Sequence, residues 1–165
     1  MKRLLLDVNV ILDFVLERPP FAVAARGLWA LSEKKEVEAF VPAHGVTTVF
    51  YLAAGRRGAA FATRVVTDLL SVPAIAAVDG AVLRRALALR WPDFEDAVCA
   101  AAAEAALCDI IVTRDPKGYP NSPVLVVDPL TALSLLGAGP APGGVADRPA
   151  ASAGRRETKA SRRRR

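Results

Sequence analysis

Three acidic residues stand beside apolar segments, where a carboxylate is unusual. Asp7 follows the run Leu-Leu-Leu, Asp96 opens an alanine-rich segment, and Asp115 comes shortly after a second apolar run. Clustered carboxylates repel one another unless a cation lies between them, and hard divalent ions such as Mg²⁺ and Mn²⁺ prefer oxygen ligands. Such an ion activates water and stabilises the charge that develops on a phosphodiester. These residue types therefore indicate metal-assisted hydrolysis.

Other catalytic arrangements fit the sequence less well. No Ser-His or Cys-His arrangement accompanies the acids, which argues against acyl transfer. A phosphotransferase or phosphatase with Asp7 as its nucleophile would want a second acid two residues later, where the chain has Asn9. A nucleotide-binding Rossmann domain is disfavoured because no Gly-x-Gly-x-x-Gly motif follows Asp7.

The apolar pattern predicts strands that alternate with helices. We expect strands over residues 3–7, 38–41, 73–78, 109–113 and 124–127, and helices over 8–16, 21–35, 43–54, 59–70, 81–89, 94–106 and 130–136. Gly55 and Gly58 predict a turn between two of the helices. The strands are continuously apolar, which is typical of a parallel sheet with helices on both faces. The sequence therefore predicts an α/β fold, a three-layer α/β/α sandwich around a mostly parallel sheet of four to five strands.

The same pattern predicts where the acids meet. Sites in parallel sheets form at the carboxyl ends of the strands. Asp7 and Asp115 lie at or just past such ends, and Asp96 falls in the first turn of a helix. Asp93 is a good residue to cap that helix, so its carboxylate can serve a structural role. Each acid taken alone also fits a turn or a cap, and only their joint placement indicates a site.

Composition indicates one globular domain followed by a basic extension. The chain has 165 residues, of which 53% are hydrophobic and 24% charged, as expected for a soluble domain with a core. Residues 1–136 carry 14 basic and 15 acidic groups, whereas residues 137–165 carry eight Lys or Arg and two acids. We predict a domain over residues 1–136 and a disordered Gly/Pro/Arg-rich tail over 137–165. The tail either binds nucleic acid through phosphate contacts or is a solubilising or incidental extension.

The sequence also bears on location and redox chemistry. No apolar run approaches the ~18 residues that a membrane span requires. Asp7 and Asp13 interrupt the N-terminal apolar run, which disfavours a cleaved signal peptide. Cys99 and Cys108 predict two buried thiols rather than a disulfide or a zinc site. We therefore expect a cytoplasmic protein without membrane association.

In this order and at these separations, three motifs resemble those of the PIN domain, and more narrowly those of VapC-type toxins of bacterial toxin–antitoxin pairs. They are LLLDVNV around Asp7, DAVCAAAA from Asp96, and IVTRD ending at Asp115, and the resemblance covers roughly residues 3–136. It implies an α/β/α sandwich whose acidic pocket binds Mg²⁺ or Mn²⁺ and cleaves RNA. It also implies a homodimer that is inhibited by a small antitoxin protein encoded alongside it.

The resemblance also assigns roles to residues. Asp7, Asp96 and Asp115 match three acids that hold the metal. Asn9 matches the polar residue that often follows the first acid, and Thr113 matches the Ser or Thr common beside the last.

One family feature is absent from this chain. The family usually carries a Glu early in the helix after the second strand, and no acid occurs here in residues 39–67. If Thr47 aligns with the Thr of that motif, Phe50 takes the place of the acid. We expect a distinct subgroup, in which Asp93 supplies the missing charge or His44 and Thr47 hold a metal-bound water.

Two functions from different classes remain open at this point. The first is a metal-dependent endoribonuclease that acts as the toxin of a toxin–antitoxin pair. The second is a catalytically weak PIN-fold module that binds RNA or a partner protein. The missing helix acid favours this module, and the basic tail fits both functions equally well. Arg114 is expected either to contact a substrate phosphate or to pair with a neighbouring acid.

Overall fold

The computed structural model describes residues 1–139, and the predicted tail from residue 140 onward lies outside this part. The strands are β1 Lys2–Leu6, β2 Val37–Pro42, β3 Ala74–Ala76, β4 Ile110–Val112 and β5 Leu125–Val127. The helices are α1 Val8–Val15, α2 Ala22–Glu33, α3 Ala43–Arg57, α4 Ala59–Leu69, α5 Gly80–Leu89, α6 Phe94–Ala105 and α7 Pro129–Leu135, with a 3₁₀ turn η1 at Pro116–Gly118. Strands and helices alternate, as the apolar pattern predicted.

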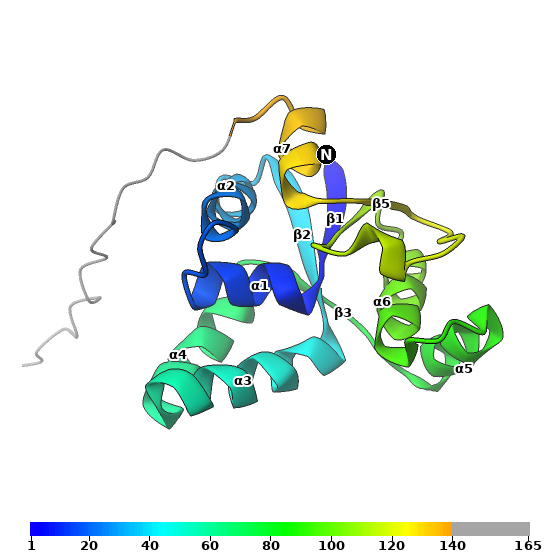
Figure 1. Ribbon diagram of the computed structural model, residues 1–165, viewed down its shortest axis with the longest axis horizontal. Helices are drawn as coiled ribbons and strands as arrows, with labels where there is room; N and C mark the ends of the chain where they lie inside the picture. Colours follow the sequence, from blue (N-terminus) through cyan, green and yellow to red (C-terminus); the bar gives the residue numbers. More distant parts are fainter. Residues whose placement is uncertain (140–165) are drawn as a thin grey trace, which may run out of the picture.

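The strands form one sheet in the order β3-β2-β1-β4-β5, and every pair is parallel (Figure 1). The chain builds β2 and β3 on one side of β1 and then crosses to build β4 and β5 on the other. The strand order therefore reverses between β1 and β4, where Asp7 N donates to Val112 O at 3.0 Å. A reversal of this kind is where open α/β sheets form their sites.

Helices cover both faces of the sheet, which confirms the predicted three-layer sandwich. Leu4 and Leu6 of β1 point into a core made with α1, α2, α3, α4 and α7. Leu5, between them, points into a second core made mainly with α5 and α6. All three leucines are almost completely buried, so β1 is a central strand with apolar neighbours on both sides. Figure 1 shows the two helical layers on either side of the strands.

Some predicted boundaries are wrong. The expected turn at Gly55 is helical, because α3 continues through Arg57 and ends only at Gly58, whose φ is +84°. A single glycine is tolerated inside a helix, whereas a positive φ breaks it and suits glycine best. The strand expected over 73–78 shortens to the three residues of β3, and η1 was not predicted.

The prediction for the two cysteines agrees with the described part of the chain. Cys99 and Cys108 are free and buried, which confirms the prediction of two buried thiols. Within residues 1–139, no helix is both long enough and apolar enough to cross a membrane.

Candidate active site

Asp7 is held rigidly at the junction of β1 and α1. It caps α1, with Oδ1 accepting a hydrogen bond from Val8 N at 2.6 Å. Its other oxygen, Oδ2, accepts from Asn9 Nδ2 at 2.6 Å and from Thr113 Oγ1 at 2.7 Å. Two of these donors come from its own helix and one from the loop after β4, so the carboxylate has a fixed orientation.

Asn9 and Thr113 connect the two chain segments at this edge of the sheet. Thr113, which is fully buried, accepts hydrogen bonds from Asn9 Nδ2 at 3.1 Å and from Asp115 N at 3.2 Å. Asn9 Oδ1 accepts from Arg114 N at 3.1 Å. The structure therefore brings Asn9 and Thr113 to Asp7, where both act through hydrogen bonds that orient it.

Asp96 enters the site from the first turn of α6. Asp93 caps this helix by accepting from Glu95 N at 2.8 Å and from Asp96 N at 3.2 Å, as its sequence position predicted. The cap fixes the first turn, and with it the position of Asp96. Asp93 is exposed and keeps its second oxygen outside this cap, so its charge also acts on Asp96.

Asp96 and Asp115 both face Gly118 in η1. A Cβ added to Gly118 would lie 2.5 Å from Asp96 Oδ2 and 3.7 Å from Asp115 Oδ2. Only glycine leaves room for such a contact without a shift of the carboxylate. The loop that carries Asp115 therefore also packs directly on Asp96.

The pKa values of Asp96 and Asp7 are both raised in the folded protein. Burial is the largest cause that raises the pKa of Asp96 from 3.8 to about 6. The negative charges of Asp93, Asp7 and Asp115 raise it as well. Burial also raises the pKa of Asp7, against the lowering effect of its hydrogen bonds from Thr113 and Val8. The four acids therefore share one electrostatic environment.

The donor set fits a hard divalent cation in its chemistry. Carboxylate oxygens are the ligands that Mg²⁺ and Mn²⁺ prefer, and a cation would offset the burial and the repulsion that raise the pKa of Asp96. In the part of the chain that the structure describes, no three His, Cys, Asp or Glu side chains are close enough to form a ready-made metal site. A bound ion would therefore have to draw the carboxylates closer together.

His44 and Thr47 lie in the first turns of α3. His44 Nε2 is 4.0 Å from Glu95 Oε1, and neither ring nitrogen has a hydrogen-bond partner among the described residues. Burial lowers the pKa of His44, although the charges of Glu95 and Asp7 oppose this, so the imidazole is neutral at pH 7. Thr47 donates its hydroxyl hydrogen to His44 O at 2.8 Å and is exposed. His44 thus lies beside the acids, whereas the Thr47 hydroxyl is bonded to its own helix.

Arg114 pairs with a neighbouring acid, which is one of its two expected roles. Its Nη1 is 3.3 Å from Asp13 Oδ1, and its guanidinium lies over the Phe21 ring at 4.6 Å from the centroid. The side chain remains one-third exposed, so part of the guanidinium still faces water.

Residues 3–117 match the family model of the PIN domain. This chain belongs to the PIN domain family. The match spans β1 to η1 and includes every acid described above. The comparison with curated proteins found no match.

Solved structures with the same fold include a VapBC complex, a toxin–antitoxin complex and a toxin. VapBC2 from Rickettsia felis, bound to a DNA fragment from its promoter, is 14% identical with a TM-score of 0.61 over 76% of this chain and 98% of that chain. A toxin–antitoxin complex from Klebsiella pneumoniae is 21% identical with a TM-score of 0.59 over 76% and 96% of the two chains. Mycobacterium tuberculosis VapC20, a Sarcin-Ricin loop cleaving toxin, is 16% identical with a TM-score of 0.55 over 66% and 86%. At these identities the likeness establishes the fold.

Asp13 is a residue of this PIN domain that the site prediction missed. It is completely buried, and its Oδ1 lies 3.3 Å from Arg114 and 4.0 Å from Arg18. Burial raises its pKa, and the two arginines lower it. The signal was present in the sequence, because Asp13 is the one acid inside the apolar helix α1 and stands one turn after Asn9. Asp13 therefore ties α1 to the loop that carries Thr113 and Asp115.

Replacing Asp13 with Ala should lower the free energy of unfolding by about 2 kcal/mol, because a buried charge pair is lost while the arginine keeps access to water. Urea denaturation followed by circular dichroism measures the change. The control is Glu36→Ala, which removes an exposed ion pair with Lys34 and should change stability by less than about 0.5 kcal/mol. Equal effects of the two substitutions would contradict the role given to Asp13.

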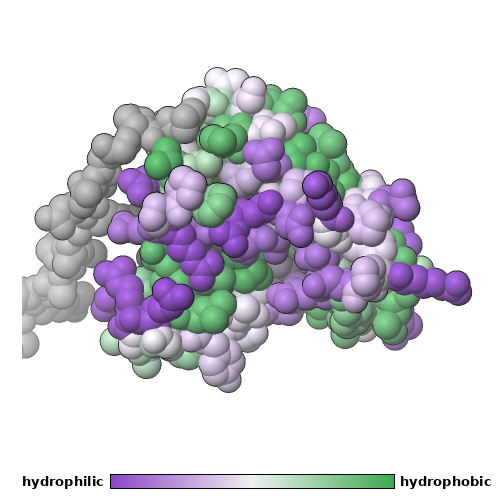
Figure 2. Space-filling view, viewed as in Figure 1, coloured by the Kyte–Doolittle hydropathy of each residue, from purple (hydrophilic) through white to green (hydrophobic). Residues whose placement is uncertain are grey.

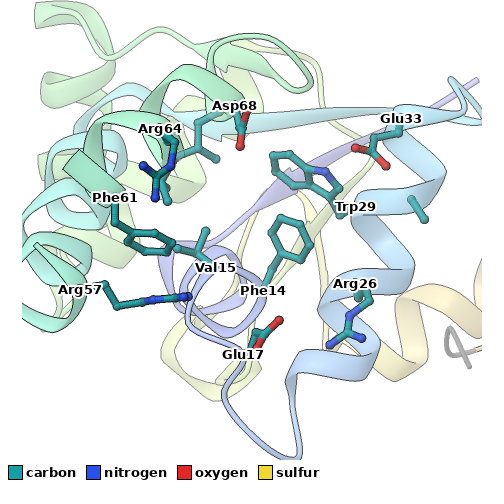
Figure 3. Close-up of a pocket in the computed structure, with 13 residues that line it drawn as sticks. Phe14, Val15, Glu17, Arg26, Trp29, Glu33, Arg57, Phe61, Arg64 and Asp68 are labelled. Atoms are coloured by element: carbon teal, nitrogen blue, oxygen red, sulfur yellow. The ribbon is translucent and has the colours of Figure 1, made fainter. Parts of the chain in front are cut away.

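A separate cavity of about 720 Å³ lies between α1, α2, α3 and α4 and contains none of the predicted site residues. Phe14 and Trp29 stack in it with ring centroids 4.5 Å apart, and Phe61 faces them (Figure 3). Charged side chains surround this apolar centre, and they are Glu17, Arg26, Glu33, Arg57, Arg64 and Asp68. Figure 2 shows apolar surface between polar residues on this side of the molecule. The cavity is therefore a surface distinct from the acidic site.

Proposed function

We propose that this PIN domain is a metal-dependent endoribonuclease that hydrolyses RNA phosphodiester bonds. The observation that carries the proposal is the gathering of Asp7, Asp96 and Asp115 at one edge of the sheet, where burial and mutual repulsion raise the pKa of Asp96 to about 6. Bound Mg²⁺ or Mn²⁺ would supply charge neutralisation and a more acidic water. Asp7, Asp96 and Asp115 would hold the ion, with Asp93 adding charge nearby.

Asn9 and Thr113 prepare Asp7 for this role. Together they occupy Oδ2 of Asp7 with two hydrogen bonds, whereas Oδ1 accepts one bond from the helix backbone. A carboxylate oxygen can accept about two hydrogen bonds, so Oδ1 keeps a lone pair for a cation or a water. This arrangement also fixes the direction in which that lone pair points.

Arg114, His44 and Thr47 are the side chains that we assign to the substrate. The exposed part of the Arg114 guanidinium can donate to a phosphate while Asp13 holds its other side. A neutral imidazole whose nitrogens have no hydrogen-bond partner within residues 1–139 can accept a hydrogen bond from a water or a ribose hydroxyl, which suits His44. Thr47 stands at the exposed side of the same helix turn.

We further propose that the protein is the toxin of a toxin–antitoxin pair in the cytoplasm. VapC20 is a toxin that cleaves the Sarcin-Ricin loop, and other structures with this fold are toxin–antitoxin complexes. The cavity around Phe14 and Trp29, apolar at its centre and charged at its rim, suits an amphipathic segment of a small antitoxin. Exposed Leu83 and Leu87, one turn apart on α5, support a homodimer.

One observation favours the alternative of a catalytically weak module that binds RNA or a partner protein. α3 brings no carboxylate to the site, and His44 stands in its first turn instead. With one acid fewer, metal affinity falls, because each carboxylate removed weakens the attraction for the ion. The same fold would then bind RNA without cutting it.

A cleavage assay separates these two functions. The intact protein is incubated with end-labelled single-stranded RNA and Mn²⁺ or Mg²⁺, with excess chelator in a parallel sample and with DNA of the same sequence in another. We expect RNA fragments that depend on the added metal. Cleavage that persists in chelator would contradict the metal mechanism, and RNA binding without any fragments would favour the module.

The basic tail should strengthen RNA binding without selecting a sequence. Residues 140–165 hold eight Lys or Arg and two acids. Removing them should weaken binding about tenfold near 0.1 M salt and reduce its salt dependence, because fewer phosphates are neutralised. Fluorescence anisotropy with labelled RNA over a series of salt concentrations measures both quantities. If the truncated protein binds RNA with unchanged affinity and an unchanged salt dependence, the tail does not contribute to RNA binding.

A further inference from the structure

Tyr119 is a buried polar residue directly behind the acids. Only 4% of its surface is exposed, and its ring packs edge-on against Trp91 with centroids 5.7 Å apart. Its hydroxyl is completely buried and has no hydrogen-bond partner of good geometry among the described residues. A buried hydroxyl without a partner is costly, so its surroundings are informative.

Two carboxylates and a thiol interact with this hydroxyl. Asp7, Asp96 and Cys99 all interact with it, and burial together with these neighbours raises the pKa of Tyr119 far above its usual range. The hydroxyl is therefore neutral and available as a donor. In return, the hydroxyl lowers the pKa of Asp7 and of Asp96, and Gly118, its neighbour in the chain, lies against the Asp96 carboxylate.

The number of hydrogen bonds that each acid already accepts favours Asp96 over Asp7 as the acceptor. Asp7 already accepts three hydrogen bonds, from Val8, Asn9 and Thr113. Within residues 1–139, no hydrogen bond of good geometry reaches the carboxylate of Asp96. The acid that lacks a donor and the hydroxyl that lacks an acceptor thus lie together.

Gly118 also contributes to the position of the Asp96 carboxylate. A Cβ at this position would lie only 2.5 Å from Asp96 Oδ2, so the absence of a side chain leaves room for the carboxylate. The φ of Gly118 is not positive, since the positive-φ glycines of the described chain are Gly58 and Gly137. The requirement at this position is therefore space for Asp96 rather than backbone freedom.

We propose that Gly118 and Tyr119 together position Asp96, the glycine by making room for its carboxylate and the tyrosine by donating a hydrogen bond to it. Both residues belong to the loop that begins with Asp115, so one loop supplies an acid and orients another. The proposal rests on the proposed function insofar as Asp96 is a metal ligand. Hydrogen bonds from groups behind a ligand tune metal affinity, and their loss commonly weakens it by about 10–100-fold.

The first test uses the metal-free protein and does not depend on activity. Tyr119→Phe and Gly118→Ala are each made in the natural chain and in an Asp96→Ala background, and the unfolding equilibrium is measured in urea. We expect each substitution to raise the unfolding constant about tenfold in the natural chain, since a charge-assisted hydrogen bond or a tight contact is disturbed. In the Asp96→Ala background, we expect less than about a threefold effect.

Two matched controls calibrate these values. Tyr51→Phe removes the hydroxyl of the other tyrosine, which is 75% exposed, and Gly55→Ala adds a Cβ that meets nothing within 4 Å. Neither control should depend on the residue at position 96. Equal effects of Tyr119→Phe or of Gly118→Ala in the two backgrounds would overturn the proposal, since a purely structural role gives no coupling.

The second test measures Mn²⁺ binding to the same variants. Tyr119→Phe should raise the Mn²⁺ dissociation constant about tenfold, and Tyr51→Phe should leave it unchanged. Equal affinity of the Tyr119→Phe variant and the natural chain would overturn the proposal. If the natural chain binds no Mn²⁺, the proposed metal function fails, and the stability cycle alone decides whether Gly118 and Tyr119 position Asp96.

Discussion

An Asp7→Asn variant should lose RNA cleavage by on the order of a thousandfold, which corresponds to about 4 kcal/mol of transition-state stabilisation. Asp7 is the most firmly held acid of the site, with three hydrogen bonds on its carboxylate. An amide is a poor ligand for Mg²⁺ compared with a carboxylate and carries no charge. Cleavage rates at saturating Mn²⁺ measure the loss.

The fold should survive this substitution, with a modest loss of stability. Val8 N, Asn9 Nδ2 and Thr113 Oγ1 all donate hydrogen bonds to the Asp7 carboxylate, so the amide of Asn would direct its NH₂ at one of these donors. We therefore expect about 1–2 kcal/mol of destabilisation, visible in urea denaturation. Asp109→Asn is the matched control, because Asp109 also accepts from a backbone N–H but lies at the opposite end of β4. Full activity of Asp7→Asn would rule out the mechanism.

An Asp96→Asn variant should be more stable than the natural chain at pH 7 when no metal is present. The pKa of Asp96 is about 6 in the folded protein and 3.8 in the reference state, so folding favours the protonated form. The folded state therefore holds more protons between pH 3.8 and 6, and stability contributed by this group falls as the pH rises through that window. The cost in stability of ionising Asp96 in the folded protein is therefore absent below pH 3.8 and complete above pH 6.

The expected gain at pH 7 is about 1–2 kcal/mol, because solvent screening reduces the penalty that the full shift would imply. Thermal unfolding in chelator at pH 4 and pH 7 measures it, and the gain should be small at pH 4. Asp79→Asn should give no such gain, since backbone hydrogen bonds from Val82 and Ala81 lower the pKa of Asp79. Adding Mn²⁺ should stabilise the natural chain more than Asp96→Asn. A less stable Asp96→Asn protein at pH 7 would contradict this electrostatic description.

The sequence predicted the parts of the site that follow directly from strand ends. Asp7 stops a continuously apolar run, and Thr113 stops another, so a parallel sheet had to bring them to one edge. The hydrogen bonds that both accept from Asn9 Nδ2 agree with that placement. Asp93 was also predicted correctly as a cap, because the preference for Asp at that position is a local property.

Features that depend on contacts between distant segments were not predicted. The ion pair of Asp13 and Arg114 joins residues 101 positions apart, and no local pattern reports such a pairing. The approach of Gly118 to Asp96 depends on η1, a turn that apolar periodicity does not reveal. A local rule also failed at Gly55, because glycine was taken to predict a turn there and the helix continues through it.

Direct Mn²⁺ binding is the measurement that tests the central claim most closely. Free Mn²⁺ is followed by electron paramagnetic resonance while it is titrated into the natural chain and, in parallel, into Asp96→Asn. We predict saturable binding to the natural chain, with a dissociation constant roughly between micromolar and millimolar, and binding at least about tenfold weaker in the variant. Absence of binding up to millimolar Mn²⁺, or equal binding by the two proteins, would contradict a metal site built from Asp7, Asp96 and Asp115.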